Sequence, residues 1–245
     1  MSERRREVTW GQRTEGQADV IRSFSLSIRQ LPDPAFRRVL VRALALAIIV
    51  FIGLAGVVWF FLAGTSFFTF WLLETIVDVL GGIAVAVVTW LLFPAVASFF
   101  VSLFLEEIVD AVEDRHYPDD PPARPVALST TVMVSLRFTG ITVALNIIAL
   151  PFYLLTFWFP PFAMAIFYCL NGYLLSREYY ELVALRRLDA ADAVSMRKVN
   201  KQRLFLAGVI ITFLFTIPIV NLFAPVIGVA AMAHIFRSLR TGEAA

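Results

Sequence analysis

Long apolar tracts, separated by blocks that hold nearly all of the charge, constrain this chain more than any other feature. Of its 21 lysines and arginines, 20 lie in residues 1–42, 106–128, 177–203 and 237–245. A bilayer core of about 30 Å requires ~20 apolar residues for each spanning helix, and several tracts between the blocks reach that length. The chain is 59% hydrophobic, with a mean hydropathy of +0.78. We therefore predict an all-α, polytopic integral membrane protein with long transmembrane helices.

Composition divides the chain into three parts. Residues 1–19 form a polar, Arg-rich leader, residues 20–237 a membrane domain, and residues 238–245 a short tail. The leader is too polar to pack, and we expect it to be disordered. The membrane domain begins with residues 20–31, whose pattern predicts an amphipathic helix lying at the membrane interface. The face expected to be apolar comprises Val20, Phe24, Ser27, Ile28 and Leu31.

Residues 39–63 and 83–105 are the strongest candidates for complete spans. Before the first of them, Asp33 is placed to cap a helix whose first turn contains Pro34. A proline at this position removes an N–H group that would lack a partner in any case. The pattern therefore predicts that the first long helix begins immediately after Asp33.

The last apolar tract, residues 204–236, carries Pro218, Asn221 and Pro225 near its middle. The arms on either side have roughly 14–15 residues, too few for a core of about 30 Å. A reversal at this point also leaves both basic flanks on the cytoplasmic side, as short basic loops prefer. We therefore predict a hemi-penetrating helical hairpin whose two arms meet between the prolines. A Pro-kinked complete span is the alternative.

The same reasoning applies to residues 129–176, where "FWFPPF" at 157–162 is a strong helix break. It predicts a second hairpin, and the greater length of its first arm leaves open whether the arms cross completely. The N-terminal block holds nine arginines. Together these features predict a multi-pass protein with cytoplasmic N- and C-termini.

Four stretches, in this order, resemble the CysZ sulfate-permease family, which shares a domain with the etoposide-induced-protein-like membrane proteins. They are "DPAFRR", "LEEIVDAVED", "GYLLSREYYELVALRR" and "IPIVNLFAPVIGVAAMAHIF". The resemblance covers roughly residues 20–237. It implies a bacterial inner-membrane protein with long helices and half-inserted hairpins, which assembles as an oligomer and conducts sulfate inwards.

The resemblance also implies an anion site at the start of the first long helix, where the family has a Gly-Leu-Arg-type motif. In "PAFRR", Arg37 and Arg38 match the basic positions, whereas Ala35 and Phe36 replace the glycine and the leucine. Glycine permits close backbone approach to an anion, so the replacement leaves the substrate open. Glu107 matches a family carboxylate that follows the second span.

Physical chemistry supports an anion-binding or gating role for the same residues, but each of them also has a structural alternative. Arg37 and Arg38 near a helix N-terminus favour an oxyanion, but basic residues there also anchor the topology. Arg137, inside an apolar tract, is predicted to contact the anion in a pore, or to extend to the interface. Glu107 and Asp110 are predicted to gate the mouth by pairing with Arg37 or Arg38. A solvated helix end is their alternative.

The sequence gives little support for an enzyme or for a cofactor-binding protein. The sequence has no Walker A run, dinucleotide-binding fingerprint, nucleophile elbow, CxxC or HExxH motif. His116 has no second histidine close in sequence, and His234 among apolar neighbours is typical of a packed core residue. Cys169 has no histidine nearby in sequence to activate it. We expect no cofactor, no metal, no nucleic acid and no catalytic activity.

These observations favour an inner-membrane permease or channel for a small oxyanion, with sulfate as the first candidate. Because no ATP-binding motif is present, transport would be passive or driven by an ion gradient. The expected partners are the anion, the lipid bilayer and further copies of the chain. The alternative is a non-transporting membrane scaffold of the same fold that binds a partner protein.

Overall fold

The structure is a computed structural model of the chain, and it describes residues 16–62, 93, 96–97, 99–121, 123 and 128–241. All regular secondary structure in these residues is helical, which confirms the predicted all-α class. Most of the second predicted span, 83–105, lies outside the described residues. The helices are α1 (Gly16–Gln30), α2 (Pro34–Leu62), α4 (Leu105–His116), α5 (Leu128–Thr156), α6 (Pro160–Ala184), α7 (Ala190–Val199), α8 (Lys201–Thr216) and α9 (Val220–Thr241).

Helix α1 is the predicted amphipathic helix, and its buried face packs against α9 and α8. Val20, Phe24 and Ser27 are buried as expected, but Ile28 is 50% exposed and Ser23 is buried instead. The hydroxyl groups of Ser23 and Ser27 donate to carbonyl groups one turn earlier in α1. Because these small side chains satisfy their own polar atoms, they allow close helix contact, and the buried face is rotated towards them.

Helix α2 begins as predicted. Pro34 is its first residue, and the Asp33 carboxylate accepts a hydrogen bond from the Ala35 N–H at 3.4 Å. The helix then continues without a break for 29 residues, or about 44 Å at 1.5 Å per residue. The prediction of one long helix over residues 39–63 is therefore confirmed up to Leu62. Its N-terminal half contacts α4 and carries a stripe of buried residues, Val39, Ala43 and Ala47, the first two of which share a core cluster with α4.

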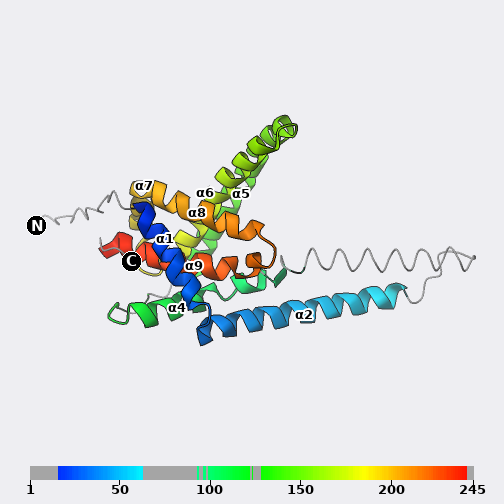
Figure 1. The fold of residues 1–245 in the computed structure, drawn as a ribbon, viewed down its shortest axis with the longest axis horizontal. Helices are drawn as coiled ribbons and strands as arrows, with labels where there is room; N and C mark the ends of the chain where they lie inside the picture. The colour runs from blue at the N-terminus through cyan, green and yellow to red at the C-terminus, as the bar shows by residue number, and fades with distance from the viewer. Residues whose placement is uncertain are drawn as a thin grey trace, which may run out of the picture.

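Helices α5 and α6 form the hairpin predicted over residues 129–176. The break lies at residues 157–159, and Pro160 and Pro161 begin α6, where a proline is tolerated. In Figure 1 the two helices run side by side and project together away from the other helices. Many of the hairpin's large apolar side chains are exposed, and Trp158 at its tip is 88% exposed.

Helices α8 and α9 form the hairpin predicted over residues 204–236, and they also lie side by side (Figure 1). The turn between them is short, because only residues 217–219 are not helical. The Val220 N–H donates to the Pro218 carbonyl at 2.8 Å, and Ile219 between them has a φ of +70°. The predicted break is thus confirmed at Pro218.

The second arm of this hairpin differs from the prediction. Pro225 lies inside α9 and not at the break, so α9 has 22 residues instead of a half-length arm. Proline has no N–H group, so α9 continues through Pro225 with one fewer helical hydrogen bond. The two arms therefore meet at residues 217–219, and the prediction that Pro225 marks the start of a half-length second arm is wrong.

The two hairpins are joined by a close contact between α6 and α8. A Cβ atom added to Gly208 would lie 1.9 Å from the carbonyl oxygen of Gly172 and 2.7 Å from the Cβ of Ser176. Only glycine at position 208 allows the two backbones to approach this closely. This contact positions the C-terminal half of α6, and the loop that follows it, against the α8–α9 hairpin.

Two stretches of the described residues are long and apolar enough to cross a membrane. They are Thr139–Thr156 within α5 and Val220–Thr241, which is α9. Helices α7 and α8 would add a third span if they counted as one, although they are bent by 87°. Length and composition therefore agree with the predicted membrane character of the chain.

Candidate functional site

An open groove of about 650 Å³ lies between the start of α2 and helix α4. Three of the five residues predicted to form the site, Arg38, Glu107 and Asp110, line this groove together. The fold brings them together because the buried stripe of α2 contacts α4. The groove is lined by Asp33, Ala35, Arg38, Glu107, Asp110, Ala111, Asp114 and Arg115.

The start of α2 already carries an anionic group of the protein itself. The Asp33 carboxylate accepts a hydrogen bond from the Ala35 N–H, and its other oxygen pairs with the Arg115 guanidinium. Phe36 is 1% exposed and anchors this turn in the core. A bound anion would therefore share the positive end of the helix with Asp33.

The two predicted carboxylates have different arginine partners from those expected. Glu107 accepts two hydrogen bonds from Nη1 of Arg42, at 3.0 and 3.2 Å. Asp110 pairs with Arg186, from the segment that follows α6, and this arginine also donates to the Glu106 carbonyl at 3.2 Å. Arg42 lies one turn after Arg38 on the same face of α2, and this spacing could have identified it from sequence.

The net charge of the groove and its edge is close to zero. Four carboxylates and two guanidinium groups line it, and Arg42 and Arg186 pair with two of the carboxylates from its edge. Within the described part of the chain, Arg38 and Asp114 are the two charged lining residues that form no ion pair. Arg38 therefore has a guanidinium group available for a ligand.

The other two predicted residues do not line the groove. Arg37 is exposed on α2, next to Arg38 but on a different face of the helix. Arg137 lies in α5, and its side chain is outside the described part of the structure.

A network of ion pairs extends from the groove towards the C-terminus. Arg187 Nη2 lies 2.6 Å from Glu113 Oε2, and this hydrogen bond raises the pKa of the Arg187 guanidinium. Asp120 pairs with both Arg237 and Arg240 near the end of α9. The basic residues after α6 and in α9 thus meet the acidic residues of α4 and the following loop. Sequence spacing alone could not have shown this pairing, because the partners are far apart in the chain.

Both histidines of the chain meet at the same end of the molecule. The rings of His116 and His234 lie edge to face with centroids 5.2 Å apart, and the Gln30 amide nitrogen lies 3.1 Å from Nε2 of His234. The Tyr117 hydroxyl lies 2.6 Å from Nδ1 of His234. His234 is completely buried, which confirms the prediction that it is a packed core residue.

Burial lowers the pKa of His116, and the positive charge of Arg115 lowers it further. The ring is therefore neutral at pH 7 and can accept a hydrogen bond. Across the residues that the structure describes, no group of three or more His, Cys, Asp or Glu side chains is arranged to hold a metal ion. The histidine pair joins α4 to α9, and Gln30 connects it to the end of α1.

Comparison with known protein families matches residues 23–225 to the family described as sulfate transporter CysZ/etoposide-induced protein 2.4. The match covers most of the chain and includes the groove, the α5–α6 hairpin, α8 and the first turns of α9. No curated protein and no solved structure matches the chain.

Proposed function

Since the chain belongs to the sulfate transporter CysZ/etoposide-induced protein 2.4 family, we propose that it is a membrane permease or channel for a small oxyanion such as sulfate. The family match over residues 23–225 is the observation that carries this proposal. The family description names a transporter, which also favours transport over an enzymatic role. Without an ATP-binding motif, movement of the anion is passive or driven by an ion gradient.

The proposed location is a bacterial inner membrane, with several membrane passes and both termini in the cytoplasm. Exposed apolar side chains on the α5–α6 hairpin support this location, because such a surface is stable only against lipid or another protein. The non-helical turns at the hairpin tips require protein or a water-filled cavity around them at membrane depth. Assembly as a homo-oligomer would supply such an environment.

In this proposal Arg38 is the principal anion-binding residue. Its guanidinium group lines the groove, lies in the second turn of α2 and forms no ion pair within the described residues. A guanidinium group can donate two parallel hydrogen bonds to one oxyanion. Arg37 adds a second positive charge beside it, and Arg137 is assigned to a later contact along the path.

The carboxylates of Glu107 and Asp110 act in this proposal by holding other arginines. Through Arg42 and Arg186 they keep two guanidinium groups at the edge of the groove. An arriving anion can compete with the carboxylates for these guanidinium groups, so the ion pairs can open and close. Glu107 and Asp110 are thus gating residues without touching the anion.

Uptake of radioactive sulfate into proteoliposomes tests the proposal. We expect the pure protein to catalyse uptake and a variant with both Arg37→Ala and Arg38→Ala to lose it by at least about tenfold, as the loss of one charge-assisted hydrogen bond predicts. The matched control carries Arg22→Ala and Arg29→Ala, two exposed arginines of α1 outside the groove. Absence of uptake by folded protein would contradict transport.

A specific observation favours a second candidate, the non-transporting scaffold. The groove is close to neutral even with Arg42 and Arg186 at its edge, because four carboxylates line it, and a neutral groove attracts an anion only weakly. A partner protein that co-purifies in a fixed stoichiometry, together with no sulfate flux, would favour the scaffold.

A further inference from the structure

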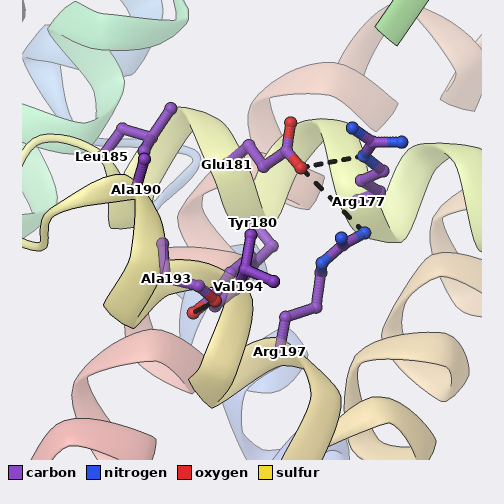
Figure 2. Close-up of a pocket in the computed structure, with 8 residues that line it drawn as sticks. All are labelled: Arg177, Tyr180, Glu181, Leu185, Ala190, Ala193, Val194 and Arg197. Carbon is purple, nitrogen blue, oxygen red and sulfur yellow. Dashed lines mark hydrogen bonds and ion pairs between the residues drawn. The ribbon is translucent and has the colours of Figure 1, made fainter. Parts of the chain in front are cut away.

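A second cavity, separate from the groove, lies between the C-terminal part of α6 and helix α7. Its volume is about 60 Å³, and none of its lining residues lines the groove. Figure 2 shows three charged side chains, Arg177, Glu181 and Arg197, at one end of this α6–α7 cavity.

Two guanidinium groups approach one carboxylate at this end of the cavity. Arg177 Nε donates to Glu181 Oε1 at 2.8 Å, and Arg197 Nη1 lies 4.0 Å from the same oxygen. The close pair is therefore Arg177 with Glu181, and Arg197 lies farther away. Their side chains are only 5%, 22% and 14% exposed for Arg177, Arg197 and Glu181, respectively.

Arg197 is the less satisfied of the two arginines. Its approach to Glu181 is too long for a hydrogen bond, and it forms none with the part of the chain that the structure describes. Burying a guanidinium group destabilises the protein unless hydrogen-bond acceptors replace the water that the group has lost. An anion in the cavity would supply these acceptors to Arg197.

The rest of the cavity strengthens such an interaction. Its remaining lining is apolar and includes the ring of Tyr180, whose hydroxyl donates to the Ala193 carbonyl at 2.9 Å. Because that hydroxyl is already bonded, the apolar wall excludes water without offering a competing polar group. Electrostatic attraction is stronger where water is excluded.

The size of the cavity limits the ligand. A buried water needs about 10–15 Å³ of such volume, so a cavity of about 60 Å³ has room for several waters. The five heavy atoms of a tetrahedral oxyanion occupy a comparable space, whereas a nucleotide or a lipid headgroup with its glycerol is too large. Guanidinium groups match the oxygen spacing of such an anion.

We propose that the α6–α7 cavity binds a tetrahedral oxyanion, with Arg197 and Arg177 as its ligands and Glu181 orienting both guanidinium groups. The site lies on elements other than the groove and does not depend on transport. An occupied site bridges the end of α6 to α7, the helix that precedes the 87° bend into α8.

Equilibrium binding of radioactive sulfate to the purified full-length protein in detergent tests this proposal. The measurement uses the variant with Arg37→Ala and Arg38→Ala as background, so that binding in the groove does not contribute. We expect saturable binding of one sulfate per chain, displaced by phosphate and not by chloride at the same concentration. Absence of saturable binding, or equal displacement by chloride, would overturn the proposal.

In this background, Arg197→Ala should weaken binding by at least about tenfold, since it removes charged hydrogen bonds to the anion. The matched control is Lys198→Ala, which removes the same charge from the next, exposed residue of α7 and should change binding by less than about twofold. Equal weakening by both substitutions would indicate a diffuse attraction to positive charge and would overturn the site.

A second variant keeps all charges and closes the space. Val194 lines the cavity, and Val194→Phe would fill it while leaving both arginines in place. We expect this variant to fold, as judged by its thermal transition, and to lose sulfate binding. Unchanged binding by Val194→Phe would place the anion elsewhere. If the protein binds sulfate in the cavity but fails to transport it, the proposed function fails and this inference stands.

Discussion

The two apolar hairpins of this protein contain candidate spans of similar hydropathy that lie in opposite environments. Their candidate spans, Thr139–Thr156 in α5 and Val220–Thr241 in α9, have nearly equal mean hydropathy, yet 6% of the first and 83% of the second is buried inside the protein. The α8–α9 hairpin lies in the core of the bundle, whereas the α5–α6 hairpin projects from it (Figure 1).

The difference follows from side-chain size more than from hydrophobicity. The buried part of α9 is rich in small residues, and a Cβ atom on Gly228 would lie 3.1 Å from the Tyr179 ring and 3.2 Å from the Ile211 side chain. Such a surface lets neighbouring helices approach closely on several sides. In α5, large side chains such as Ile147 and Leu150 point outwards and are 65% and 57% exposed. Small residues thus select the helix that becomes the core.

The largest expected effect concerns the environment of α5–α6. Cys169, the single cysteine of the chain, is exposed on α6. If the hairpin is covered by lipid, a polar maleimide should label this thiol more than about tenfold more slowly in membranes than after unfolding, because reaction needs a hydrated thiolate.

The control for this labelling is Lys198→Cys in a Cys169→Ser background. This position is exposed at the charged end of α7, and we expect it to react rapidly in both states. Equal labelling rates of Cys169 and the control in intact membranes would place the α5–α6 hairpin in water and remove the basis of the comparison.

A matched pair of isoleucine-to-alanine substitutions compares the packing of the two hairpins directly. Ile211 in α8 is fully buried, so Ile211→Ala should lower the free energy of unfolding by about 2–5 kcal/mol. Ile147→Ala removes the same atoms from the exposed surface of α5 and should cost less than about 0.5 kcal/mol in detergent. Thermal or denaturant unfolding of both variants measures the difference. Equal losses would mean that α5 is as well packed as α8.

A smaller and opposite effect is expected at the turn of the α8–α9 hairpin. Ile219 is 75% exposed and has a φ of +70°, a conformation that costs a β-branched residue on the order of 1–2 kcal/mol. Ile219→Gly should therefore stabilise the protein by about 1 kcal/mol, after allowance for the greater freedom of glycine when unfolded. Ile217→Gly, where φ is −90°, is the control and should destabilise it. A loss of stability in Ile219→Gly would refute backbone strain at the turn.

The smallest expected effect is on the pH dependence of the free energy of unfolding. It arises at His116, where α1, α4 and the α8–α9 hairpin meet. Because the pKa of His116 is lowered in the folded protein, the unfolded chain binds a proton at a higher pH than the folded chain does. The contribution of neutral His116 to the free energy of unfolding is complete above a pH of about 6.5. It is lost progressively as the pH falls towards the lowered pKa of the folded protein.

Unfolding free energies of the wild type and of His116→Gln, measured between pH 7.5 and about 5, test this prediction. The wild type should lose stability more steeply than the variant as the pH falls below about 6.5. Parallel curves would show that His116 has the same pKa in the folded and unfolded states.

Much of the fold was predictable from local chemistry. Proline breaks at Pro218 and Pro160, the cap at Asp33 and the length of the first tract all depend on residues adjacent in the chain. For that reason the long helix, the amphipathic helix and both hairpin turns were found from sequence. The inclusion of Pro225 in α9 was missed, because an early proline in a helix resembles a break in sequence alone.

The candidate site was predictable only in part. The grouping of Arg38, Glu107 and Asp110 followed from their positions at neighbouring helix ends. The sequence did not predict which arginines pair with the two carboxylates. That pairing depends on how α2 and the end of α6 are rotated against α4. The histidine pair and the α6–α7 cavity likewise join segments that are remote in the chain.

The sequence by itself determined that this protein is helical, where its chain reverses, and at which ends its charges gather. These properties follow from hydrophobic length, proline and charge, which act over a few neighbouring residues. Only the tertiary structure decided which of two equally apolar hairpins became the core and which arginine faced which carboxylate. Those choices depend on the shape and rotation of whole helices, since close packing and ion pairs are sensitive to displacements of about one ångström.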